Sequence, residues 1–186
     1  MVPSATLFAV LLFALIPASL AGRLALAEVS HPRPVSVLAA TVGASLTNKP
    51  APAFSLAALD GRPLTLAHLR GKVILLNFWA TWCAPCQIEM PTFSAWQTQY
   101  GRQGLQVIGI SMDDDPALAR RAVERLRVSY PVAMGNARLG ARYGGVLGLP
   151  LTFLIDRQGI VRASFQGETD LHAIEKQIQS LLTQRR

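Results

Sequence analysis

Both cysteines of the 186-residue chain lie in one short stretch, Trp82-Cys83-Ala84-Pro85-Cys86. A nearly continuous apolar run over residues 73–79 precedes them and predicts a strand that is buried on both faces. Residues 85 to about 100 carry a helical pattern instead. A Cys-x-x-Cys pair at a junction from strand to helix is typical of redox-active dithiols, which exchange electrons with disulfides.

The junction predicts a different chemical task for each cysteine. The first turn of a helix offers free backbone N–H groups and a partial positive charge, which favour a thiolate over a thiol. Cys83 lies at that end, so we expect it to be partly exposed and to act as the nucleophile. Cys86 lies one turn further along, and we expect it to resolve the mixed disulfide that Cys83 forms. Pro85 lacks an N–H group, which costs nothing this early in a helix and stiffens the turn.

Two other uses of the cysteine pair stay open from the residues alone. A structural disulfide would also suit an exported protein, although a loop of two residues restrains little unfolded-chain entropy. A metal site would need ligands besides the two thiolates. His31, His68 and His172 have no evident spacing to the cysteines, so we expect no metal.

The rest of the chain predicts the elements that hold this junction. From residue 51 onward, strand and helix patterns alternate, and a hairpin precedes the final helix. This order predicts an α/β fold, with a central mixed β-sheet flanked by helices. The expected elements are a small hairpin over 54–66, strands over 73–79 and 105–111, a helix over 115–126, short pieces over 130–134 and 138–143, a hairpin over 151–165 and a helix over 170–183.

The amino-terminal region has the composition of a targeting segment. Residues 5–21 are uncharged and largely apolar, and small residues at alternate positions follow at 25–27. This pattern predicts that residues 1–27 are a secretory signal peptide or an uncleaved N-terminal membrane anchor. Residues 28–49, with several prolines and many small residues, are predicted to be a linker, and residues 50–186 the folded domain.

The formal net charge of +7, from 18 Lys and Arg against 11 Asp and Glu, does not indicate a nucleic-acid partner. The cations are spread along the chain, whereas nucleic-acid binders gather them on one face or arm. One cluster, Arg120, Arg121, Arg125 and Arg127, suits either the solvated face of a helix or a docking surface for an acidic partner.

Three segments carry the motifs of a known family. They are residues 51–56 with Asp60-Gly61 and residues 69–72, residues 77–91 around the cysteines, and residues 148–156 with Gly159. Together they resemble the TlpA/ResA-like thiol–disulfide oxidoreductases of the thioredoxin superfamily. The resemblance extends from about residue 50 to the end of the chain. It implies a thioredoxin fold with an inserted helix and strand over about 113–132.

The resemblance also implies roles for residues outside the cysteine pair. It assigns Pro150 as a cis-proline that faces the cysteines, and the backbone of Leu149 as the partner of the substrate chain. Glu89 matches an acidic residue three positions after the second cysteine, where its carboxyl group would serve the resolving thiol as acid or base. The expected substrate-binding surface is completed by Trp82, Ala84 and Pro85.

The family implies an exported reductant that needs no cofactor besides its own Cys83–Cys86 disulfide. Such proteins keep selected exported thiols reduced, for example in cytochrome c maturation or copper delivery, and a membrane electron donor of the thiol-transfer type recharges them. The expected partners are therefore a protein disulfide and that donor, in a periplasmic or other extracytoplasmic location. The alternatives are a thiol peroxidase, which is peroxiredoxin-like, and a non-enzymatic copper-handling module of the same fold.

Three sequence details bear on this interpretation. Asn77 stands where ordinary thioredoxins carry an aspartate that assists proton transfer, so that task falls to Glu89 or to water. No histidine lies between the two cysteines, unlike in exported oxidases that introduce disulfides, and this favours reduction. Leu151 stands where the cytochrome-maturation subgroup often carries an acidic residue.

Overall fold

The computed structural model describes residues 46–184. The predicted signal peptide or anchor, residues 1–27, and residues 28–45 of the predicted linker lie outside the described residues. The backbone N–H of Asn48, near the end of that linker, donates to the carbonyl of Val161 at 2.8 Å. Within residues 46–184, no helix is both long enough and apolar enough to cross a membrane.

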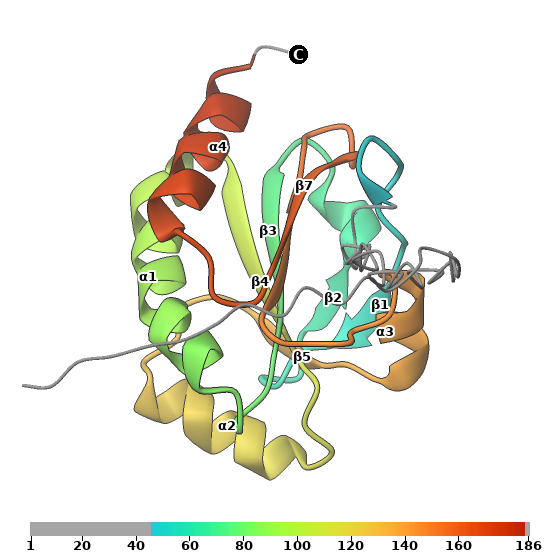
Figure 1. The fold of residues 1–186 in the computed structure, drawn as a ribbon, viewed down its shortest axis with the longest axis vertical. Helices are drawn as coiled ribbons and strands as arrows, with labels where there is room; N and C mark the ends of the chain where they lie inside the picture. The colour runs from blue at the N-terminus through green and yellow to red at the C-terminus, as the bar shows by residue number, and fades with distance from the viewer. Residues whose placement is uncertain (1–45, 185–186) are drawn as a thin grey trace, which may run out of the picture. The chain divides into compact units, whose positions relative to one another are not determined.

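A five-stranded mixed sheet forms the centre of the domain, in the order β5-β4-β3-β6-β7 (Figure 1). The strands β3 (Val73–Trp79), β4 (Leu105–Ser111) and β5 (Val132–Met134) are parallel to one another. The strand β6 (Leu151–Ile155) is antiparallel to both of its neighbours, β3 and β7 (Val161–Gln166). All seven residues of β3 are buried, which confirms the prediction of a strand covered on both faces.

Each face of the sheet has its own apolar core. The core on one face takes side chains from α1 (Ala84–Tyr100), α2 (Pro116–Arg125) and α4 (Leu171–Thr183). The core on the other face takes them from α3 (Ala137–Arg142) and from the hairpin of β1 (Ser55–Ala57) and β2 (Pro63–Thr65), and Figure 1 shows this division. The apolar side chains of β3 alternate between the two cores, as the period of two in a strand requires. Asn77, at an odd-numbered position like Leu75 and Trp79, therefore belongs to the α1 face.

The helix α2 and the strand β5 follow β4 and occupy the region of the predicted insertion. The side chain of Asp115 caps α2 by accepting the N–H of Ala117 at 2.8 Å, and Pro116 occupies the first helical position. Both features agree with the residue preferences at a helix start. The strand β5 pairs with the second half of β4. The insertion therefore adds an edge strand to the sheet, on the β4 side of β3, the strand that leads to the cysteines.

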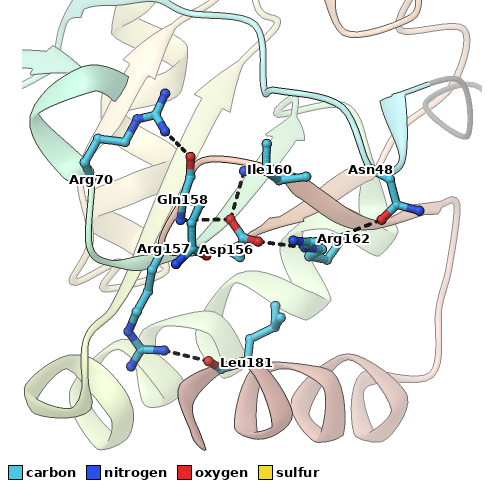
Figure 2. Close-up of polar contacts among 8 residues, drawn as sticks. All are labelled: Asn48, Arg70, Asp156, Arg157, Gln158, Ile160, Arg162 and Leu181. Carbon is cyan, nitrogen blue, oxygen red and sulfur yellow. Dashed lines mark hydrogen bonds and ion pairs between the residues drawn. The ribbon is translucent and has the colours of Figure 1, made fainter. Parts of the chain in front are cut away.

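A polar network closes the turn between β6 and β7 (Figure 2). The carboxylate of Asp156 accepts the backbone N–H groups of Gln158 and Ile160, each at 2.9 Å, and the Nε–H of Arg162 at 2.6 Å. The guanidinium of Arg70 donates to the carbonyl of Gln158. Because β6 is antiparallel to β3, this turn lies beside the start of β3, whereas the cysteines follow its end.

The next residue of the same turn, Arg157, holds the carboxyl end of α4 (Figure 2). Its guanidinium donates to the carbonyls of Leu181 at 2.6 Å and Leu182 at 3.0 Å. The last carbonyls of a helix have no partner inside the helix and carry a partial negative charge, so a cation is favourable there. Part of the positive charge of the chain thus stabilises the fold and lies away from the cysteines.

Candidate active site

The cysteine pair lies where the sequence predicts it, between the end of β3 and the start of α1. Cys83 is the N-cap residue of α1, and its sulfur is bonded to that of Cys86, with 5.4 Å between the two Cα atoms. Pro85 occupies the first turn of the helix. The backbone N–H of Cys86 donates to the Sγ of Cys83 at 3.3 Å. A donor of the helix terminus therefore already points at the sulfur that would carry negative charge after reduction.

The two cysteines differ in their access to solvent. Cys83 is 5% exposed and Cys86 is fully buried. Cys83 is more buried than the expected partial exposure, because it packs into the same core as Trp79 and Met90. Of the two residues, only Cys83 has any exposed surface in the disulfide form.

Two of the expected substrate-binding residues, Leu149 and Pro150, directly precede β6. The peptide bond between Leu149 and Pro150 is cis. The register of β3 and β6 pairs Phe78 with Leu151, so Leu149 and Pro150 continue β6 beside the residues that follow β3. Leu149 packs against the core that contains both cysteines.

Large apolar side chains are exposed around this region. Trp82, next to Cys83, is 73% exposed, and Ala84 on its other side is also exposed. Two apolar residues that the sequence did not single out for substrate contact join them. Ile88 on α1 is 72% exposed, and Leu147, three residues before the cis proline, is 83% exposed. Their exposure could not be recognised from the sequence, where an apolar residue at a helical position favours packing in the core.

Glu89 is buried, with 4% of its surface exposed. The pKa of its carboxyl group is raised to about 7: burial is the main cause, the backbone N–H of Thr169 lowers the pKa in part, and the negative charge of Glu168 adds a smaller increase. Its Oε2 atom has no hydrogen-bond partner among the described residues. Glu89 follows Cys86 by three residues on one helix, a spacing that puts side chains on the same face. A carboxyl group in this state can hold or release a proton close to neutral pH.

Three more buried polar atoms lack a hydrogen-bond partner in the part of the chain that the structure describes: Asn77 Oδ1, Trp79 Nε1 and Tyr130 Oη. Asn77 is held by the bond from its Nδ2 to the hydroxyl oxygen of Thr152, at 2.9 Å. Trp79 and Tyr130 belong to the core on the α1 face, and the negative charge of Glu89 acts on Tyr130. Nothing in the local sequence pattern of Tyr130 signals an unpaired hydroxyl group, so this residue could not be predicted from the sequence.

The arginine cluster of α2 is partly engaged within the domain. Arg120 donates to the carbonyl of Leu59, and Arg125 donates to the Oε1 of Gln87 at 2.7 Å. These contacts fix two of the guanidinium groups, while all four arginines of the cluster remain exposed. Over residues 46–184, no three His, Cys, Asp or Glu side chains come together in a way that could hold a metal ion.

Comparisons with known proteins agree with this geometry. The model of the AhpC/TSA family matches residues 47–164. A thiol-disulfide oxidoreductase ResA of Bacillus thuringiensis subsp. konkukian is 32% identical over 133 residues, which cover 72% of this chain and 77% of that protein. The thiol:disulfide interchange protein DsbE of Pseudomonas aeruginosa is 38% identical over 144 residues, with 75% and 77% covered.

Solved structures of similar proteins share the fold. A crystal structure of a thiol:disulfide interchange protein of the thioredoxin family from Chlorobium tepidum superposes with a TM-score of 0.67 at 30% identity. The match covers 72% of this chain and 95% of that one. The chain, with its dithiol pair between a buried strand and a helix, belongs to the TlpA/ResA-like thiol–disulfide oxidoreductases of the thioredoxin superfamily.

Proposed function

We propose that this enzyme is an exported reductant of protein disulfides. The observation that carries the proposal is the placement of Cys83, which caps α1, accepts the N–H of Cys86 and is the one residue of the pair with exposed surface. The absence of a histidine between the cysteines supports reduction over oxidation as the direction.

The reaction needs only the two cysteines and two electrons. In the dithiol form, the Cys83 thiolate attacks one sulfur of the partner's disulfide, and the second sulfur of the partner leaves and takes up a proton. Cys86 then loses its proton and attacks the Sγ of Cys83, which releases the first sulfur of the partner as a thiol. The Cys83–Cys86 disulfide of the structure is the oxidised product of this sequence. A membrane electron donor of the thiol-transfer type would return the dithiol.

Glu89 would take the proton of Cys86 in the second step and return it in the recharging step. Its pKa of about 7 lies where a general base and acid works best in neutral solution. Asn77, which has no proton to exchange, cannot replace it. The backbone of Leu149 would pair with the partner chain, beside the exposed apolar side chains of Trp82 and Ile88.

The resemblance to the family supports an extracytoplasmic setting, with an exported protein as substrate. The apolar segment within residues 1–27 would direct export, as a cleaved signal or as an anchor. Cytochrome c maturation is one pathway that such a reductant would serve. The leucine at position 151, where the cytochrome-maturation subgroup often has an acidic residue, argues for testing other substrates as well.

A thiol peroxidase is the alternative of a different reaction class. Peroxiredoxins place a threonine three residues before the attacking cysteine, whereas Thr81 precedes Cys83 by two. The hydroxyl group of Thr81 donates to Asp113 Oδ1 at 2.6 Å and is therefore engaged elsewhere. Consumption of peroxide that depends on Cys83 and outpaces disulfide reduction would favour this alternative. Stoichiometric Cu(I) binding without reductase activity would instead favour a copper-handling module.

Insulin reduction by the parent protein and by two serine variants tests the proposed function. We expect Cys83→Ser to abolish reduction, because the nucleophile is lost. We expect Cys86→Ser to accumulate mixed disulfides, because the resolving thiol is lost. Unchanged activity in both variants would contradict the proposal. Trapping with Cys86→Ser in the native envelope would then identify the natural substrate.

A further inference from the structure

Side chains hold both backbone polar groups of one residue, Thr81, in the turn that leads to Cys83. The backbone N–H of Thr81 donates to the two carboxylate oxygens of Asp113, at 3.1 and 3.0 Å, and the Thr81 hydroxyl donates to Oδ1 at 2.6 Å. The carbonyl of Thr81 accepts the Nε2–H of Gln87 at 2.6 Å. The turn continues with the N–H of Cys83, which donates to the carbonyl of Ala80 at 3.1 Å.

Both groups of contacts lead to the inserted segment. Asp113 lies two residues after the end of β4, is 7% exposed, and also accepts the hydroxyl of Ser111 at 2.8 Å. On the other side, the Oε1 of Gln87 accepts an N–H of Arg125, in the last turn of α2, at 2.7 Å. A chain of hydrogen bonds thus runs from Asp113, at the start of the insertion, through the backbone of Thr81 and the side chain of Gln87 to Arg125, at the end of its helix.

We propose that Asp113, Gln87 and Arg125 are positioning residues, which fix the turn before Cys83 so that its sulfur is aligned for attack on a disulfide. They act through Thr81 and do not touch the reacting atoms. Exchange between sulfurs is sensitive to alignment, because the attacking sulfur must meet the partner disulfide in a defined geometry. The insertion, on this proposal, contributes to the rate of exchange at Cys83 as well as to the stability of the sheet.

The chemistry of Asp113 makes the proposal specific. The contacts from Thr81 and the Ser111 hydroxyl to its two oxygens are all donated to it, which suits an ionised carboxylate that only accepts. In an Asp113→Asn variant, one oxygen becomes an amide nitrogen whose hydrogens face the N–H or hydroxyl groups. At least one of the contacts is therefore lost although the shape of the side chain is kept.

The test measures the attack of the reduced protein on a small aromatic disulfide, dithiobis(nitrobenzoate), as a function of pH. The plateau of the second-order rate constant at high pH reports alignment, because all of Cys83 is then thiolate. We expect Gln87→Met to lower that plateau about fivefold, the factor that corresponds to one net hydrogen bond. Arg121→Met is the matched control, since it removes an exposed cation from the same helix without touching Gln87. We expect the plateau of the control to stay within about twofold of the parent.

A double-mutant cycle separates positioning from general stabilisation. If Arg125 acts through Gln87, the Gln87→Met/Arg125→Met double variant is no slower than Gln87→Met alone. An Arg125→Lys variant, which keeps a donor, should recover most of the plateau that Arg125→Met loses. If Asp113→Asn fails to fold, the variants of Gln87 and Arg125, which are both less buried, still test the positioning proposal.

Parent-like plateaus for Gln87→Met and Arg125→Met would overturn the proposal, whatever happens to the free energy of unfolding. Independent, additive losses at the two positions would overturn the chain of contacts through Gln87. The inference depends on the proposed disulfide exchange, and the parent protein tests that separately. A parent that does not reduce insulin contradicts the function, whereas an active parent with insensitive variants contradicts only the positioning.

Discussion

Burial of Glu89 makes the stability of the folded protein depend on pH in a predictable direction. The ordinary pKa of the group, 4.5, applies to the unfolded chain, and burial raises the pKa to about 7 in the folded protein. Between these two values the folded protein keeps a proton that the unfolded chain has lost. The free energy of unfolding must therefore fall as the pH rises from 4.5 to about 7 and level off above that.

The size of this effect follows from the same two values. At about 1.4 kcal/mol for each pH unit, the interval from 4.5 to about 7 corresponds to a loss of about 3 kcal/mol. The isosteric change Glu89→Gln removes the titration and should abolish this component. The quantity of interest is the free energy of unfolding of the variant minus that of the parent. We expect this difference to be about 3 kcal/mol larger at pH 8 than at pH 4.

Urea unfolding of the oxidised protein at several pH values between 4 and 8, followed by circular dichroism, measures the difference. Other titrating groups cancel because each variant is compared with the parent at the same pH. The control is Glu124→Gln, at an exposed position of α2, where the carboxylate stays hydrated in both states and the profile should follow the parent. A difference between Glu89→Gln and the parent that stays constant within about 1 kcal/mol from pH 4 to pH 8 would refute the argument.

Three further substitutions test the packing around the site and at the far end of the sheet. Arg157→Met should lower the free energy of unfolding by about 2 kcal/mol, because the Leu181 carbonyl loses a charged donor, and a urea midpoint equal to the parent's would contradict this. Tyr130→Phe should raise the free energy of unfolding by about 1 kcal/mol, because a buried hydroxyl without a partner is removed. A clear decrease of the free energy of unfolding in the same urea titration would show that the hydroxyl is paired. Gly109→Ala should lower the thermal midpoint and reduce the free energy of unfolding by about 1 to 3 kcal/mol, because the added Cβ would lie 3.1 Å from Val132 Cγ2. An unchanged midpoint would show that the neighbouring side chains move aside without a loss of stability.

Much of the fold could be predicted from local patterns. The run over residues 73–79 predicts β3, because six of its seven residues are apolar and such a run suits a strand covered on both faces. The Asp60-Gly61 pair predicts the β1–β2 hairpin, and Gly61 has the positive φ of 85° that such a turn requires. Asp115 and Pro116 predict the start of α2 through capping chemistry. In each case a short segment carries enough information by itself.

The cysteine pair was predictable for the same reason, since its place between strand and helix is a local property. The environment of Glu89 was not. Its spacing from Cys86 is visible in the sequence, but its pKa depends on its burial in the fold and on Thr169 and Glu168, about 80 residues away in the chain. The exposure of Ile88 and Leu147 likewise depends on which neighbours the fold leaves out.

The hydrogen-bond chain through Thr81 shows most clearly where local patterns stop being informative. Asp113 stands among three consecutive aspartates, and capping alone accounts for only the third of them, Asp115. The first of the three is distinguished by its contact with Thr81, which precedes it by 32 residues in the chain. That contact exists because β3 and β4 are adjacent parallel strands that end at the same edge, where Trp79 pairs with Ser111. An acidic residue just past the end of β4 therefore meets the turn just past the end of β3. An insertion that begins just past the end of one parallel strand can therefore contact the turn that follows the neighbouring strand. The order of the strands in the sheet shows this proximity, whereas the local sequence does not.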